Sequence, residues 1–175
     1  MTYRFVALLL VVVSLCSAQD IFSKAETEFP AWCKDEIAKL DKVYTIVPYL
    51  HPTFITADLT GDGTEDIAIA ITGQKNKKGV LIINQETKKK YFLGAGTEFG
   101  NGGDEWAWLV KWKLYAEKKA NQTQFDQKTG DITGSKTITL KHNAIQLYEL
   151  SDGTASAVAL LYWDGKNYTW IHQGE

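Results

Sequence analysis

The chain has 175 residues, with 19 lysines and arginines against 21 aspartates and glutamates, and a formal net charge of −2. That length suits one domain with a real hydrophobic core. The near balance of charge implies no strongly basic face, so nucleic acid is a poor candidate partner.

Residues 1–18 have the pattern of a secretory signal peptide. Arg4 supplies the positive start, residues 5–13 form an unbroken apolar run, and Ala18 ends a stretch of small residues suited to cleavage. The apolar run is too short for a membrane span, which needs about 20 residues. We therefore expect a secreted or periplasmic protein with no membrane span in its mature chain.

The mature chain is expected to be a single β-rich domain over residues 19–175. An alternative is a lipoprotein anchored through Cys16. Lipid attachment normally needs a small residue just before the cysteine, and Leu15 is not small. Cleavage after Ala18 is therefore the favoured interpretation.

A helix is predicted over residues 30–43, because Pro30 suits the first helical turn and apolar residues recur at helical spacing. This apolar face consists of Cys33, Ile37, Leu40 and Tyr44. Cys33 is the only cysteine after the signal peptide, so the mature chain cannot form an internal disulfide. Its apolar neighbours favour a buried thiol over one that pairs with another chain.

Short apolar segments separated by turns predict strands along the rest of the chain. The expected fold class is mainly β (α+β), with an N-terminal helix followed by two antiparallel sheets of about four strands each. Each sheet has the size of one propeller blade, but the absence of an internal repeat excludes a closed propeller at this length. The predicted strands are 53–56, 67–72, 80–84 and 90–93 in the first sheet, and 136–141, 144–150, 155–163 and 168–172 in the second.

The loop Asp58-Leu-Thr-Gly-Asp-Gly-Thr-Glu-Asp66 between the first two strands has the spacing of a calcium site. Calcium takes roughly six to eight oxygen ligands, which a short loop can supply from alternate positions. Gly63 stands at position six, where the chain must bend sharply. The predicted metal ligands at positions one, three, five, seven and nine are Asp58, Thr60, Asp62, Thr64 (through its carbonyl) and Asp66.

The segment differs from an EF-hand loop, because Ile69 stands at position twelve in place of glutamate and a strand, not a helix, follows. The loop resembles instead the metal loop of the FG-GAP/VCBS repeat family, D-x-[DN]-x-D-G-x-x-D leading into a strand. The resemblance is limited to about residues 54–83 and implies a structural calcium ion. Thr60 stands where that family usually has Asn or Asp, which implies weak binding. The alternative is a metal-free Asp/Gly-rich turn, although three converging carboxylates favour a cation.

A glycine-rich loop over residues 94–103 precedes a predicted strand in which tryptophans alternate on one face. Trp106, Trp108 and Trp112 are interpreted as core residues, because each ring buries a large apolar area. A platform for stacking sugars is the alternative. Residues 116–134 are polar and are predicted to form a surface excursion or a long hairpin.

No catalytic constellation is evident, because His51, His142 and His172 lack ligand spacing and no nucleophile or metalloprotease motif occurs. The sequence therefore predicts a protein that is not an enzyme. The favoured function is a secreted or periplasmic calcium-binding module, with a mainly structural metal, acting in protein or glycan binding. The alternative is an envelope inhibitor or immunity-type protein that blocks a toxin or hydrolase.

Overall fold

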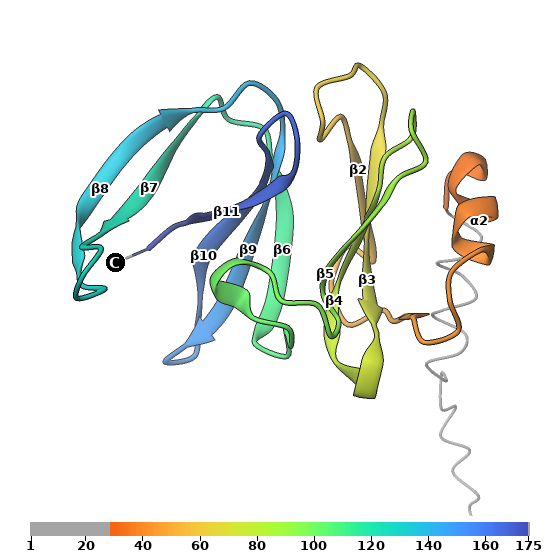
Figure 1. Ribbon diagram of the computed structural model, residues 1–175, viewed down its shortest axis with the longest axis horizontal. Helices are drawn as coiled ribbons and strands as arrows, with labels where there is room; N and C mark the ends of the chain where they lie inside the picture. Colours follow the sequence, from red (N-terminus) through yellow and green to blue (C-terminus); the bar gives the residue numbers. More distant parts are fainter. Residues whose placement is uncertain (1–28, 175) are drawn as a thin grey trace, which may run out of the picture.

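The computed structural model describes residues 29–174, so the predicted signal peptide lies outside the described residues. Within that range the protein is mainly β, with one α-helix and several antiparallel sheets, none of them closed into a barrel or propeller (Figure 1). The predicted fold class is therefore confirmed.

The first sheet is organised around β3 (Asp66–Thr72), which is buried along almost its whole length. The strands β1 (Thr45–Ile46) and β2 (Phe54–Ala57) pair with β3, and β4 (Lys78–Ile83) and β5 (Lys90–Gly94) follow on its other side. Both faces of this sheet are covered by other parts of the protein. This explains why β3 and β4 are continuous apolar runs, without the alternation of a half-exposed strand.

The second sheet contains β6 (Leu109–Tyr115), β9 (Ala144–Ser151), β10 (Thr154–Trp163) and β11 (Tyr168–His172), in the order β11-β10-β9-β6. Two further strands, β7 (Lys119–Phe125) and β8 (Ile132–Thr139), form a separate hairpin, here called the outer ribbon. The long hairpin predicted as one alternative for residues 116–134 is thus present, whereas the strand predicted over 136–141 overlaps β8 and belongs to the ribbon, not to the second sheet. Only one face of the ribbon packs on the sheet, so a strand pair forms here with few apolar residues.

These elements lie in successive layers, from α2 (Ala31–Ala38) through the first sheet and the second sheet to the outer ribbon (Figure 1). The largest core fills the space between the two sheets, with Ile55, Ala68 and Ile82 from one side and Leu109, Trp112, Leu147 and Leu161 from the other. A second core lies between helix and first sheet, and a third between second sheet and ribbon.

The helix ends at Ala38, earlier than the predicted end at residue 43. The carboxylate of Asp41 accepts a hydrogen bond from the backbone N–H of Val43 at 3.0 Å, and this local turn competes with further helix. Cys33 is fully buried against the first sheet, as predicted, and its thiol donates to the carbonyl of Pro30 at 3.2 Å. Burial raises the pKa of this thiol to about 11.

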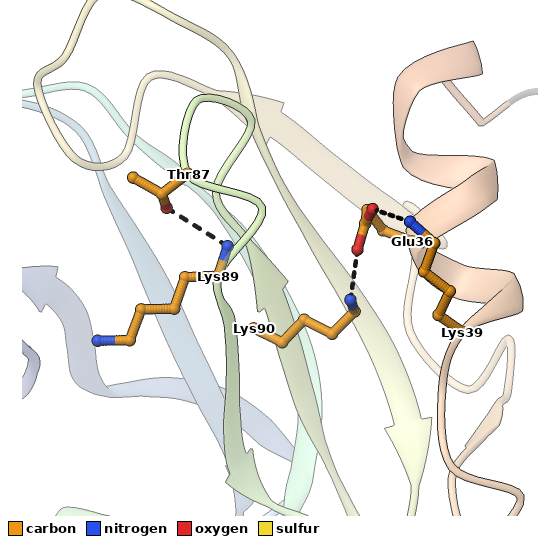
Figure 2. A network of polar contacts seen from close by, with 5 residues as sticks. All are labelled: Glu36, Lys39, Thr87, Lys89 and Lys90. Atoms are coloured by element: carbon orange, nitrogen blue, oxygen red, sulfur yellow. Dashed lines mark hydrogen bonds and ion pairs between the residues drawn. The ribbon is translucent and has the colours of Figure 1, made fainter.

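An ion-pair network fastens the helix to the first sheet (Figure 2). Glu36 is buried, and its carboxylate forms ion pairs with Nζ of Lys39 at 2.7 Å and with Nζ of Lys90, on β5, at 2.5 Å. The hydrogen bonds from Lys39 and then Lys90 lower the pKa of Glu36 to about 2. Beside them, the hydroxyl of Thr87 accepts from the backbone N–H of Lys89 at 3.3 Å, which shapes the turn that leads into β5.

Acid is expected to weaken the attachment of the helix through Glu36. Because its pKa is lower in the folded protein than the ordinary 4.5, its contribution to stability is complete above pH 4.5 and is lost as the pH falls toward 2. Glu36→Gln should therefore reduce the fall in melting temperature across this interval. Thermal unfolding at a series of pH values measures this fall in melting temperature. The matched control is Asp35→Asn, which neutralises an exposed neighbouring carboxylate. Identical pH profiles for wild type and Glu36→Gln would contradict this role.

Candidate functional site

The loop that carries the predicted metal ligands joins β2 to β3 and reaches the second sheet. Gly61 and Gly63 form its bend, with positive φ angles of 79° and 85° respectively. A Cβ on Gly61 would lie 2.8 Å from the ring of His142, so the loop packs closely on the turn before β9. The side chain of Asn143 also donates to the carbonyl of Asp58 at 3.1 Å. The loop therefore connects the two sheets at this end.

Asp66 is the buried centre of the loop. One carboxylate oxygen accepts from the backbone N–H groups of Leu59 and Thr60 and from the Thr60 hydroxyl, at 3.0 to 3.1 Å. The other accepts from the side chain of Asn84 at 2.8 Å and from the backbone N–H of Gln85 at 3.1 Å. Burial nevertheless raises the pKa of Asp66, because removal from water outweighs these donors.

Asn84 brings three of the predicted ligands to one point. Its Nδ2 lies 2.8 Å from Oδ1 of Asp66, 2.9 Å from Oδ2 of Asp62 and 3.1 Å from Oγ1 of Thr60. Its oxygen accepts from the backbone N–H and the hydroxyl of Thr87, both at 2.6 Å. Because a backbone N–H can only donate, the amide must present its oxygen to Thr87 and its NH₂ group to the three loop oxygens.

The other predicted ligands are engaged within the loop. Each carboxylate oxygen of Asp58 accepts a backbone hydrogen bond: Oδ1 from the N–H of Gly61 at 2.6 Å and Oδ2 from the N–H of Gly63 at 3.1 Å. Thr64 donates to Oδ1 of Asp62 through its N–H at 2.8 Å and its hydroxyl at 2.7 Å. For Asp62, burial raises the pKa, but the bonds from Thr64 and Asn84 outweigh it and lower the pKa to about 2.

The five predicted residues thus separate into two groups: Thr60, Asp62 and Asp66 converge on Asn84, while Asp58 and Thr64 do not. Across residues 29–174, no three acidic, histidine or cysteine side chains are grouped closely enough to hold a metal ion. The donor set is nevertheless chemically suited to calcium, because carboxylate and hydroxyl oxygens are the ligands that this ion takes. Asn84 was missed from the sequence, where its only signal is a polar residue directly after the apolar run of β4.

The tryptophans predicted to alternate on one strand occupy different environments. Trp106 and Trp112 are fully buried in the core between the sheets, as predicted, whereas Trp108 is only partly buried. The strand begins at Leu109, and a β-bulge before Lys111 breaks the period of two. Val110 is consequently 44% exposed.

Trp108 and Trp170 line a cleft of about 630 Å³, here called the aromatic cleft. Their ring centroids lie 5.9 Å apart in an edge-to-face arrangement, and Trp106 packs against both. The cleft is formed by the second sheet, the turn η2 (Gly100–Gly102) and the end of the described chain. Its lining residues are Asn101, Gly102, Trp108, Glu149, Ser151, Ser156, Ala157, Val158, Trp170, His172, Gln173 and Gly174.

Comparison with known proteins gives no match to a protein-family model, a curated protein or a solved structure. The likeness of the loop to FG-GAP/VCBS repeats therefore stays a prediction. Among the described residues, no helix has the length and apolar character needed to cross a membrane.

Proposed function

We propose that the protein is a secreted or periplasmic binding module whose Asp58–Asp66 loop takes up calcium as a structural ion. The supporting observation is the convergence of oxygens from Thr60, Asp62 and Asp66 on a single point, 2.8 to 3.1 Å from the Asn84 nitrogen. An NH₂ group satisfies such oxygens with partial positive charge, and a cation would satisfy them more strongly.

Calcium would be held by Thr60, Asp62 and Asp66, with Asp58 and the carbonyl of Thr64 completing the set. This binding requires the Asn84 amide to withdraw, because calcium takes oxygens at about 2.3–2.6 Å and cannot share the point with a nitrogen. Competition from this internal donor and the neutral hydroxyl of Thr60 favour weak binding, with a Kd on the order of 10⁻⁴–10⁻³ M, as in extracellular modules. The ion would supply charge neutralisation and fix the loop against the second sheet.

Calcium is expected to raise the melting temperature of the purified protein. At a concentration tenfold above the Kd, a ligand that binds only the folded state adds about 1.4 kcal/mol to the free energy of unfolding. Asp62→Ala should abolish the rise, because it removes one of the converging oxygens. Glu65→Ala, which removes an exposed carboxylate from the same loop, should retain it. An unchanged melting curve for the wild-type protein in about 10 mM calcium, tenfold above the upper end of the expected Kd, would overturn the proposal.

The binding role itself has a separate support in the aromatic cleft. Figure 1 shows the β2–β3 loop and the β9–β10 turn at opposite ends of the sheets. The cleft lies toward the second of these ends, since Ser151 and Ser156 flank that turn. The loop and the cleft are therefore distinct sites, and they can be tested separately.

A further inference from the structure

We propose that the aromatic cleft binds a neutral, polyhydroxylated ligand, namely the pyranose rings of a glycan. This inference names the ligand class for the binding role proposed above and rests on that role, but not on the metal in the loop. A volume of about 630 Å³ lies within the range of small-molecule sites, about 300–1,000 Å³. It therefore accommodates a small saccharide.

The cleft is built where both neighbours of β9 are irregular. A register shift in β10 between Ala157 and Ala159 and another in β6 between Leu109 and Lys111 face the same part of β9, residues 147–149. Bulges of this kind bend a sheet and redirect side chains, and they are frequent beside functional sites. Val158, the extra residue of the β10 bulge, lines the cleft.

The inner face of the second sheet changes character at this point. Leu147 is buried against the first sheet, and Glu149 and Ser151 continue the same face of β9 into the cleft. On β10, Ser156 pairs with Glu149 across the strands. The face is thus polar and exposed where the cleft lies, and these side chains offer hydroxyl and carboxylate groups to a ligand.

Two polar atoms of cleft-lining side chains have no partner in the described structure. They are Nε1 of Trp170 and Nδ1 of His172, and both are buried. In contrast, Nε1 of Trp106 donates to the carbonyl of Gly103 at 3.0 Å, and Nε1 of Trp108 donates to that of Gly102 at 3.2 Å. A buried polar group without a partner destabilises the folded protein. Less than 1 Å² of either atom is accessible, so neither is a direct contact for a ligand in this conformation of the cleft.

The glycines of η2 hold the rim of the cleft against Trp170. A Cβ on Gly100 would lie 2.4 Å from the Cβ of Trp170, and one on Gly102 would lie 2.8 Å from its ring. Only glycine permits this approach. Trp170 is thereby kept in a fixed position beside Trp108, and rigid indole surfaces of this type pack well on the apolar C–H faces of pyranose rings.

The charge of the cleft disfavours anionic ligands. None of its lining residues is lysine or arginine, and Glu149 is its one carboxylate. An anionic ligand would find no counter-charge and would face Glu149. A cationic ligand would gain from Glu149 and the indole rings, and the choline probe below tests this class directly. A neutral ligand with many hydroxyls suits all of these groups.

The test uses the full mature chain and the methyl glycosides of glucose, galactose, mannose and N-acetylglucosamine, with choline and methyl glucuronoside as charged probes. Saturation-transfer NMR and tryptophan fluorescence measure binding with calcium and with EDTA. We expect saturable binding of at least one neutral glycoside under both conditions. Trp108→Ala should weaken it about tenfold, through loss of one stacking surface.

Ser156→Trp should abolish binding by filling the cleft from an exposed position. Its matched control is Ala155→Trp, which places the same ring at the neighbouring exposed position on the opposite face of β10, away from the cleft, and should leave binding unchanged. Failure of every neutral glycoside to bind, binding that survives Ser156→Trp, or binding of a charged probe alone would overturn the inference. Glycoside binding without a calcium-dependent rise in melting temperature would overturn the metal proposal only, and the converse result would overturn the cleft only.

Discussion

Asp66→Ala is expected to lower the free energy of unfolding by about 3–5 kcal/mol, a large part of the stability of a domain of this size. The carboxylate accepts five hydrogen bonds, three of them from backbone N–H groups that belong to Leu59, Thr60 and Gln85. Alanine leaves these buried donors without partners and opens a cavity at the start of β3. Chemical denaturation monitored by circular dichroism measures the loss.

The matched control is Glu65→Ala, which removes an exposed carboxylate one residue earlier. Its effect should stay within about 0.5 kcal/mol, as for most surface substitutions. A similar small effect for Asp66→Ala would show that water replaces the carboxylate without penalty. The organising role of Asp66 in the loop would then be wrong.

Trp112→Ala is expected to cost about 3–5 kcal/mol, because its ring is 1% exposed and fills the core between the two sheets. The indole also donates to the carbonyl of Pro52 at 2.7 Å, which attaches β6 to the segment before β2. Trp112→Phe keeps most of the apolar volume and removes the donor. It should therefore cost less than the alanine variant.

Val110→Ala and Leu114→Ala are the controls, because both side chains lie on the same strand and are 44% and 38% exposed. Each should change the free energy of unfolding by less than about 1 kcal/mol. Equal losses for Trp112→Ala and Val110→Ala in denaturant titrations would mean that the ring does not hold the sheets together.

The fold class was predictable because its signals are local. The apolar runs at 67–72 and 80–83 mark strands covered on both faces. The pairs Asp152-Gly153 and Asp164-Gly165 are strong hairpin signals in the sequence and mark the turns of the later hairpins. For the hairpin of β7 and β8, the sequence left a surface excursion and a long hairpin open, because a strand pair that packs on one side only needs few apolar residues. The bulge in β6 was missed because alternation in sequence cannot show which residue a partner strand leaves unpaired.

The candidate sites also contain parts that the local sequence predicts and parts that arise only in the folded protein. The loop positions Asp58 to Asp66 follow from spacing alone, and the positive φ of Gly61 and Gly63 follows from the need to bend. The part played by Asn84 does not follow, because it comes from another strand and meets the loop only in the folded sheet. The aromatic cleft likewise joins residues more than 70 positions apart, from Asn101 to Gly174.

The side-chain amide of Asn84 offers the most direct test of calcium binding in the loop. Its two NH₂ signals can be followed in ¹H–¹⁵N spectra of the labelled protein while calcium is added. Withdrawal of the amide from Thr60, Asp62 and Asp66 predicts that these signals shift and saturate together with the backbone signals of the loop. Asn84 signals that stay unchanged while millimolar calcium is added would contradict a metal site at this point.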